Sequence, residues 1–122
     1  MTLKGPVLVV DDDEAIRQVV GMALSDEGYE VLTASDGADA LLLAGQRTPR
    51  VILLDMRMPV MDGWQFARAY RQTPGSHAPI VVVTAAAEAA RRAMEIEAED
   101  VLPKPFRIDE LLTVIHRYAD QD

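Results

Sequence analysis

A short apolar run, a polar turn and a segment with helical periodicity follow one another five times along this chain. Runs such as Val-Leu-Val-Val at residues 7–10 and Val-Ile-Leu-Leu at residues 51–54 are continuous, which is typical of strands buried on both faces of a sheet. The other runs are at residues 31–33, 80–83 and 101–102. Because the connections are short, this alternation predicts an α/β fold with a doubly wound, five-stranded parallel sheet and helices on both faces.

The helical segments carry start and stop signals. Apolar residues between 16 and 24 recur at the spacing of an amphipathic helix, and Gly28 stands where a left-handed residue would end it. Asp36 is placed to cap the second helix. Residues 86–97 are rich in alanine, which favours a helix by propensity. Because Pro103 cannot donate a ladder hydrogen bond, we expect the fifth strand at a sheet edge.

The composition limits the chain to a few functional classes. Its 122 residues fit one domain, which we expect to span residues 1–122. The absence of cysteine excludes a disulfide scaffold, a thiol nucleophile and a thiolate metal site. A formal net charge of -8 argues against direct nucleic-acid binding. The apolar runs are too short to cross a membrane, and we expect no secretory signal.

Polar and charged residues follow four of the five apolar runs. Three aspartates, at residues 11–13, come after the first run, and Asp55 comes after the third. Thr84 follows the fourth run, and Lys104 follows the fifth. In open parallel sheets the binding crevice lies outside the carboxyl ends of the strands. We therefore expect these side chains to meet in one crevice.

That combination favours phosphoryl transfer. Two carboxylates about 4 Å apart repel by roughly 4 kcal/mol at an effective dielectric constant near 20, so the site needs a proton or a cation. Oxygen ligands suit Mg²⁺, and Lys104 supplies a point charge for an anion. Thr84 would donate a hydrogen bond while a carboxylate attacks in line. Each residue alone has a structural explanation, as a helix cap, a strand end or a solvated lysine; only their combination points to chemistry.

At these residues the chain resembles the receiver domain of two-component response regulators, the CheY-like superfamily. The matching stretches are residues 9–13, 54–63, 83–85 and 104–106, in the family's order and spacing. The resemblance covers essentially the whole chain and implies a single receiver domain. It also implies a flavodoxin-like sheet with strand order 2-1-3-4-5.

The resemblance implies a role for each acidic residue of the site. Asp55 would accept a phosphoryl group from a histidine kinase or a phosphotransfer protein. Asp12 and Asp55 would bind Mg²⁺ through their side chains, and Arg57 through its backbone carbonyl. Asp11 would complete the cluster, mostly through a metal-bound water, while Asp13 would cap the first helix.

The resemblance also implies how the signal is held and passed on. Thr84 would contact the phosphoryl group and Lys104 would pair with it, across a cis Lys104–Pro105 peptide. Phosphorylation would change the face formed by the fourth helix, fifth strand and fifth helix, and so control a partner protein or an output domain. The same face could join two copies in a homodimer. We expect a cytoplasmic switch, with no direct nucleic-acid or membrane partner, that catalyses only its own phosphorylation and dephosphorylation.

The chain departs from the family's usual pattern at three places. Val101 stands where an aromatic switch residue is usual, so the common coupling from Thr84 to that ring is in doubt. Arg57 and Ala86 occupy the two variable positions that tune the lifetime of the phosphoryl group in the family. No glycine follows the fourth helix, so we expect this helix to run on or to fray at its acidic end, residues 95–100.

Two alternative functions remain at this stage. A phosphorylation-independent, receiver-like module that binds proteins is kept open by Val101. A Mg²⁺-dependent phosphohydrolase would need a nucleophile and an acid two residues apart after the first strand, and usually a cap domain. Here the predicted nucleophile, Asp55, follows the third strand, and the chain has no room for a cap.

Overall fold

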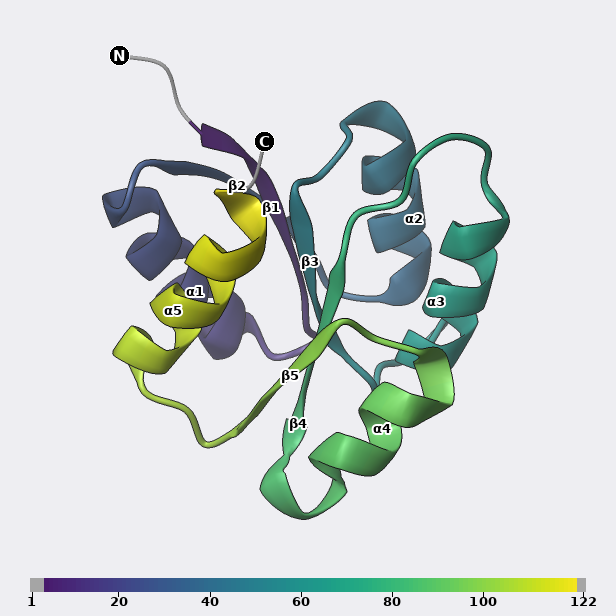
Figure 1. Cartoon of the computed structure of the whole chain (residues 1–122). Helices are drawn as coiled ribbons and strands as arrows, with labels where there is room; N and C mark the ends of the chain where they lie inside the picture. The colour runs from purple at the N-terminus through teal and green to yellow at the C-terminus, as the bar shows by residue number, and fades with distance from the viewer. Residues whose placement is uncertain (1–3, 121–122) are drawn as a thin grey trace.

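The computed structural model describes residues 4–120, and within them a single parallel sheet forms the centre of the molecule (Figure 1). Its strand order is β2-β1-β3-β4-β5, as expected. The strands are β1 (Lys4–Val10), β2 (Tyr29–Ala34), β3 (Val51–Asp55), β4 (Ile80–Ala85) and β5 (Asp100–Lys104). In the described chain β5 pairs only with β4, which confirms the edge position predicted from its proline.

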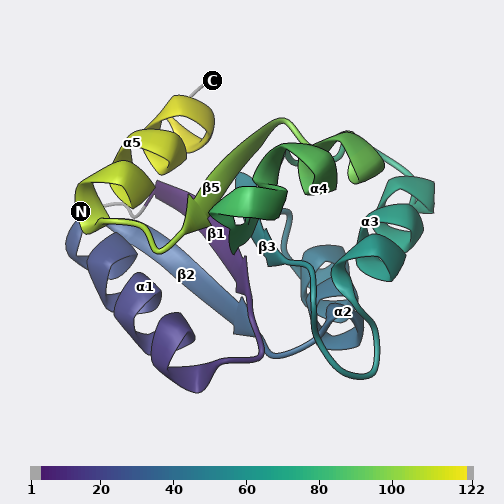
Figure 2. The same ribbon diagram turned by 90° about the horizontal axis from the view of Figure 1, so that it is seen from below.

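The helices cover both faces of the sheet (Figure 2). They are α1 (Glu14–Asp26), α2 (Gly37–Gln46), α3 (Gly63–Gln72), α4 (Ala89–Ile96) and α5 (Ile108–Ala119). Helices α1 and α5 lie on one face, and α2, α3 and α4 lie on the other (Figures 1 and 2). Each of these helices, as described, is too short or too polar to cross a bilayer.

Alternate residues of each strand pack into two separate cores, one on each face of the sheet. Val7 and Val9 of β1 pack with α1 and α5, whereas Leu8 and Val10 pack with the helices of the other face. All four side chains are buried. The continuous apolar run in β1 is therefore explained by burial on both faces, and the polar residues that follow it emerge at the end of the sheet.

The C-terminal ends of α1 and α4 compare differently with the signals in the sequence. Gly28 has a φ of 89° just beyond α1, as the sequence predicts for a left-handed C′ residue. The expectation that α4 would run on or fray is wrong. The helix stops at Ile96 because Glu97 adopts a left-handed conformation with φ 53°, and Ala98 N–H donates back to the Ala93 carbonyl at 2.9 Å.

A tertiary contact supports this helix end. The guanidinium of Arg71, on α3, donates to the carbonyl oxygens of Ile96 and Glu97. These are among the last carbonyls of α4, which have no partner within the helix. At its other end α4 begins later than its alanine content suggests, because residues 86–88 form a single 3₁₀ turn. Helix α4 is thus short, and α3 secures its C-terminus.

Candidate functional site

The carboxyl ends of four strands bring the predicted site residues together. Asp11 directly follows β1, and Asp55 is the last residue of β3. Thr84 is the fifth residue of β4, opposite Pro103, and Lys104 is the last residue of β5. Parallel strands end at the same edge of the sheet, so the register of the strands itself builds the crevice.

Three carboxylates form an acidic cluster at this edge. Asp11, Asp12 and Asp55 each offer an oxygen, and these atoms all lie within 4.8 Å of one another. Asp11 is buried, Asp55 is half-buried and Asp12 is exposed. Such a set of hard oxygen ligands, open to solvent on one side, fits a Mg²⁺ ion that keeps some of its waters. The residues present therefore suit the predicted metal.

Lys104 supplies the positive charge of the crevice. Its Nζ lies 3.2 Å from Asp11 Oδ2 and 3.9 Å from Asp55 Oδ1. The Lys104–Pro105 peptide is cis, as expected. The ammonium thus stands beside the predicted acceptor, where it could pair with an anion attached to Asp55.

The electrostatics of the crevice favour proton or cation uptake at Asp55. Burial, and next the negative charge of Asp11, raise the pKa of Asp55 from 3.8 to about 6. Lys104 and the backbone N–H of Arg57 act in the opposite direction, while Asp12 adds a smaller upward shift. In the cation-free protein, ionising Asp55 therefore costs free energy that a bound cation would recover.

Local hydrogen bonds hold the loop after β1. The Asp13 carboxylate accepts from the N–H groups of Ala15 and Ile16 at 2.9 and 3.3 Å, which confirms its role as the cap of α1. Asp13 N–H in turn donates to Asp11 Oδ1 at 2.9 Å. Arg17 Nη1 donates to the Asp11 carbonyl at 2.7 Å. We did not predict this contact of Arg17, although its place one turn into α1 lets it reach back to the loop.

The remaining predicted positions lie on β4, on β5 and in the turn after β4. Thr84 is buried at the end of β4, and Ala86 is exposed at the start of the 3₁₀ turn. Val101 is half-buried, pairs with Val82 and packs against the core under α3 and α4. The roles of Thr84, Ala86 and Val101 stay predictions.

Arg57 turns toward α3. Its guanidinium carbon lies 5.9 Å from the centre of the Trp64 ring, within cation–π range. Phe66 and Tyr70 of α3 are buried and their rings stack, so these two side chains serve packing. Trp64 does more, because its Nε1 also donates to Glu95 Oε1 on α4 at 3.1 Å.

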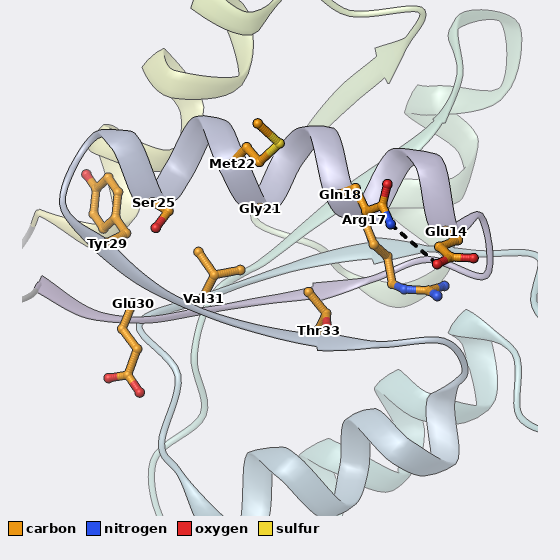
Figure 3. A pocket seen from close by; sticks show the side chains of 10 residues that line it. All are labelled: Glu14, Arg17, Gln18, Gly21, Met22, Ser25, Tyr29, Glu30, Val31 and Thr33. Carbon is orange, nitrogen blue, oxygen red and sulfur yellow. Dashed lines mark hydrogen bonds between the residues drawn. The ribbon is translucent and has the colours of Figure 1, made fainter.

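A separate groove of about 660 Å³ lies between α1 and β2 (Figure 3). Met22, Gln18 and Glu14 project from α1, while Glu30, Val31 and Thr33 project from β2. None of the predicted site residues lines it. The chemistry of the strand ends, rather than the size of a hollow, therefore locates the candidate site.

Comparisons with known proteins agree with this geometry. The family model of the response regulator receiver domain matches residues 7–116. Response regulator MprA of Mycobacterium sp. strain KMS is 43% identical over 108 residues, 87% of this chain and 46% of that protein. MprA of Mycobacterium leprae strain TN is 40% identical over 111 residues, 89% of this chain and 48% of that protein. The chain thus spans about half the length of these relatives.

Solved structures show the same likeness. The chemotaxis response regulator CheY4 of Vibrio cholerae has a TM-score of 0.85 and 39% identity, covering 94% of this chain and 98% of that chain. The receiver domain of NtrX from Brucella abortus has a TM-score of 0.82 and 34% identity, covering 95% of this chain and 99% of that chain. In both cases nearly the whole fold is shared.

Proposed function

The chain belongs to the response regulator receiver domain family, and from that premise we propose that it is a phosphorylation-controlled switch with Asp55 as its acceptor. Control by phosphorylation is general for this family, as is Mg²⁺ binding at an acidic cluster. The observation that carries the proposal for this chain is the meeting of Lys104 with Asp11 and Asp55 at the strand ends. This arrangement offers a nucleophile and a cation to one anionic group.

The proposed reaction transfers a phosphoryl group from a phosphohistidine of a histidine kinase or a phosphotransfer protein. An oxygen of ionised Asp55 attacks phosphorus, so a phosphorus–oxygen bond forms as the phosphorus–nitrogen bond breaks. The electron pair of the broken bond stays on the imidazole nitrogen, which takes up a proton. Near neutral pH most of the Asp55 carboxyl is ionised, because its pKa is about 6. Lys104 then pairs with the transferred group, and the Thr84 hydroxyl donates to it.

Asp11, Asp12 and Asp55 would hold Mg²⁺, together with the backbone carbonyl of Arg57. When bound, this ion supplies positive charge that offsets the carboxylates and the incoming phosphoryl oxygens. The return to the resting state is hydrolysis. Water attacks phosphorus, the bond to Asp55 breaks, and the carboxylate and inorganic phosphate are released. We propose that Arg57 and Ala86, which flank the acceptor, set the rate of this step.

We propose that the output is a change in the face formed by α4, β5 and α5. This face would control a partner protein or an output domain, or join two copies of the chain. We place this single receiver domain, residues 1–122, in the cytoplasm with protein partners rather than nucleic acid or membrane.

A titration with beryllofluoride and Mg²⁺, followed by amide NMR, tests the proposal. We expect shifts at Asp55, at Thr84 and along residues 85–97, all of them lost in Asp55→Asn. Shifts that survive in Asp55→Asn would refute Asp55 as the acceptor.

The same spectra test a second candidate function, a receiver-like module that binds its partner without phosphorylation. Val101 favours this candidate, because it has no ring to move between two positions. In that case the shifts would be confined to the crevice, and α4 would not respond.

A further inference from the structure

We infer that Arg57 and Trp64 couple the acceptor site to α4, in place of an aromatic side chain at position 101. The Arg57 guanidinium would lie on the Trp64 ring in the resting protein and would move to the phosphoryl group when Asp55 is modified. This inference rests on the proposed function, since it names the side chains through which that switch reaches α4.

Trp64 lies close to two guanidinium groups that come from different elements. The Arg57 guanidinium carbon, in the loop after β3, is 5.9 Å from the ring centre, and that of Arg92, on α4, is 4.9 Å away. The ring's Nε1 also donates to Glu95 Oε1, on α4, at 3.1 Å. The indole therefore contacts both the loop beside the acceptor and α4.

On α4, the partner of Trp64 is firmly held. Arg92 is a buried charge, and its guanidinium donates to Glu88 Oε1 at 2.6 Å and to Glu95 Oε1 at 3.1 Å. Separating a buried charge from its partners is costly, because both sides lose their ion pairs. The Arg92 side chain therefore has little freedom to move away from Glu88 and Glu95. A displacement of the Trp64 ring must then move the side chains of α4 that touch it.

The anchoring of α4 suits such a response. Its buried apolar side chains are Ala89 and Ile96, so it has little apolar surface fixed to the sheet. Its polar contacts with α3 run through Trp64 and through Arg71 at the C-terminal end. Elements with few buried apolar contacts belong to the less stable parts of a fold, from which moving elements are drawn.

Arg57 has the freedom that Arg92 lacks. Its side chain is exposed, and only Met56 stands between it and Asp55 along the chain. A phosphoryl group would add a charge of roughly -2 and several strong acceptor oxygens beside it. A charge-assisted, bidentate contact to such a group is stronger than an exposed cation–π contact. The modified state therefore offers Arg57 a better partner than the ring, which is the differential interaction that a switch requires.

Val101 explains why a different connection is needed. It is half-buried against the core under α3 and α4, with neither a ring nor a hydroxyl to report on Thr84. The cluster around Trp64 reaches α4 directly from the β3–α3 side of the crevice. It therefore bypasses position 101.

The single tryptophan of the chain makes the inference testable by fluorescence and by its indole N–H resonance. The informative variant is Arg57→Gln, which keeps the backbone carbonyl and removes the charge. The matched control is Arg68→Gln, because Arg68 is an exposed arginine on α3 one turn beyond Trp64. All three proteins are measured with Mg²⁺ alone and with Mg²⁺ plus beryllofluoride.

In the wild type and in Arg68→Gln, we expect beryllofluoride to change the Trp64 emission and to shift the amides of α4. In Arg57→Gln the emission should already be changed before beryllofluoride is added. The response of Trp64 and α4 to beryllofluoride should then fall by roughly two- to fivefold. This factor is the change in an equilibrium constant that corresponds to the free energy of an exposed cation–π contact. Shifts at Asp55 and Thr84 should persist in all three proteins.

Two results would overturn the inference. If Trp64 and α4 respond equally in Arg57→Gln and in the wild type, while Asp55 and Thr84 shift in both, the inference fails and the proposed function stands. If beryllofluoride shifts no residue of the crevice in any of the proteins, both fail together.

Discussion

Asp55→Asn should stabilise the metal-free protein, increasingly so as the pH rises. The folded-state pKa of Asp55 is raised from 3.8 to about 6, chiefly by burial and by Asp11. A raised carboxyl pKa means that the folded state favours the protonated form. The contribution of Asp55 to the free energy of unfolding is therefore fully present below the unfolded pKa and is lost as the pH rises through the folded pKa. Asparagine has no proton to lose and avoids this loss.

The size of the effect follows from the shift. A difference of about 2 pKa units corresponds to about 3 kcal/mol at pH values well above both pKa values. At about pH 4 the folded carboxyl is protonated and the unfolded one is only partly ionised, so the same linkage gives about 0.5 kcal/mol. The Asp55 side chain is only 13% exposed, so solvent screens little of this difference.

Urea unfolding in the presence of a chelator measures this difference. With a urea m-value of about 1–3 kcal/mol/M, the midpoint of Asp55→Asn should exceed that of the wild type by about 1–3 M at about pH 8. The two midpoints should nearly coincide at about pH 4. Asp26→Asn is the matched control, because Asp26 is exposed at the end of α1 and should show no such trend. A variant no more stable than the wild type at pH 8, or a gain that does not depend on pH, would refute the reasoning.

Three further predictions follow. Saturating Mg²⁺ should raise the melting temperature of the wild type but not of Asp12→Asn, and equal increases would argue against the metal site. Arg57→Ala should change the rate of dephosphorylation, so equal half-lives in a radiolabelled phosphate-release assay would contradict its tuning role. Glu97→Gly should stabilise the protein by about 1 kcal/mol, because Glu97 has a φ of 53° where glycine is unstrained; unchanged or lower stability in thermal unfolding would contradict this.

The fold was predictable because the sequence of each strand reflects which of its faces are buried. A strand covered on both faces needs continuous apolar residues, as β1 and β3 have, and the polar residues after them mark the edge of the sheet. The convergence of Asp11, Asp55 and Lys104 follows from parallel pairing, so it too could be inferred before any coordinates.

The end of α4 and the cluster around Trp64 were not predictable in this way. Glycine is the usual signal for a left-handed helix end, and here Glu97 takes that conformation with Arg71, from another helix, beside it. The contacts of Trp64 with Arg57 and Arg92 likewise join the loop before α3 to α4, which is distant from that loop in sequence. A local pattern can only hint at such contacts, as the Glu88–Arg92 spacing does for a helical ion pair.

The most direct test of the account is to locate the phosphoryl group itself. The protein is incubated with Mg²⁺ and a small acyl phosphate donor, and the modified residue is identified by peptide mass spectrometry. We expect one phosphoryl group on the peptide that contains Asp55, removed by hydroxylamine as an acyl phosphate would be, and no modification when Mg²⁺ is chelated. A phosphoryl group on another residue of the wild type, or equal labelling of that peptide in Asp55→Asn, would contradict the account.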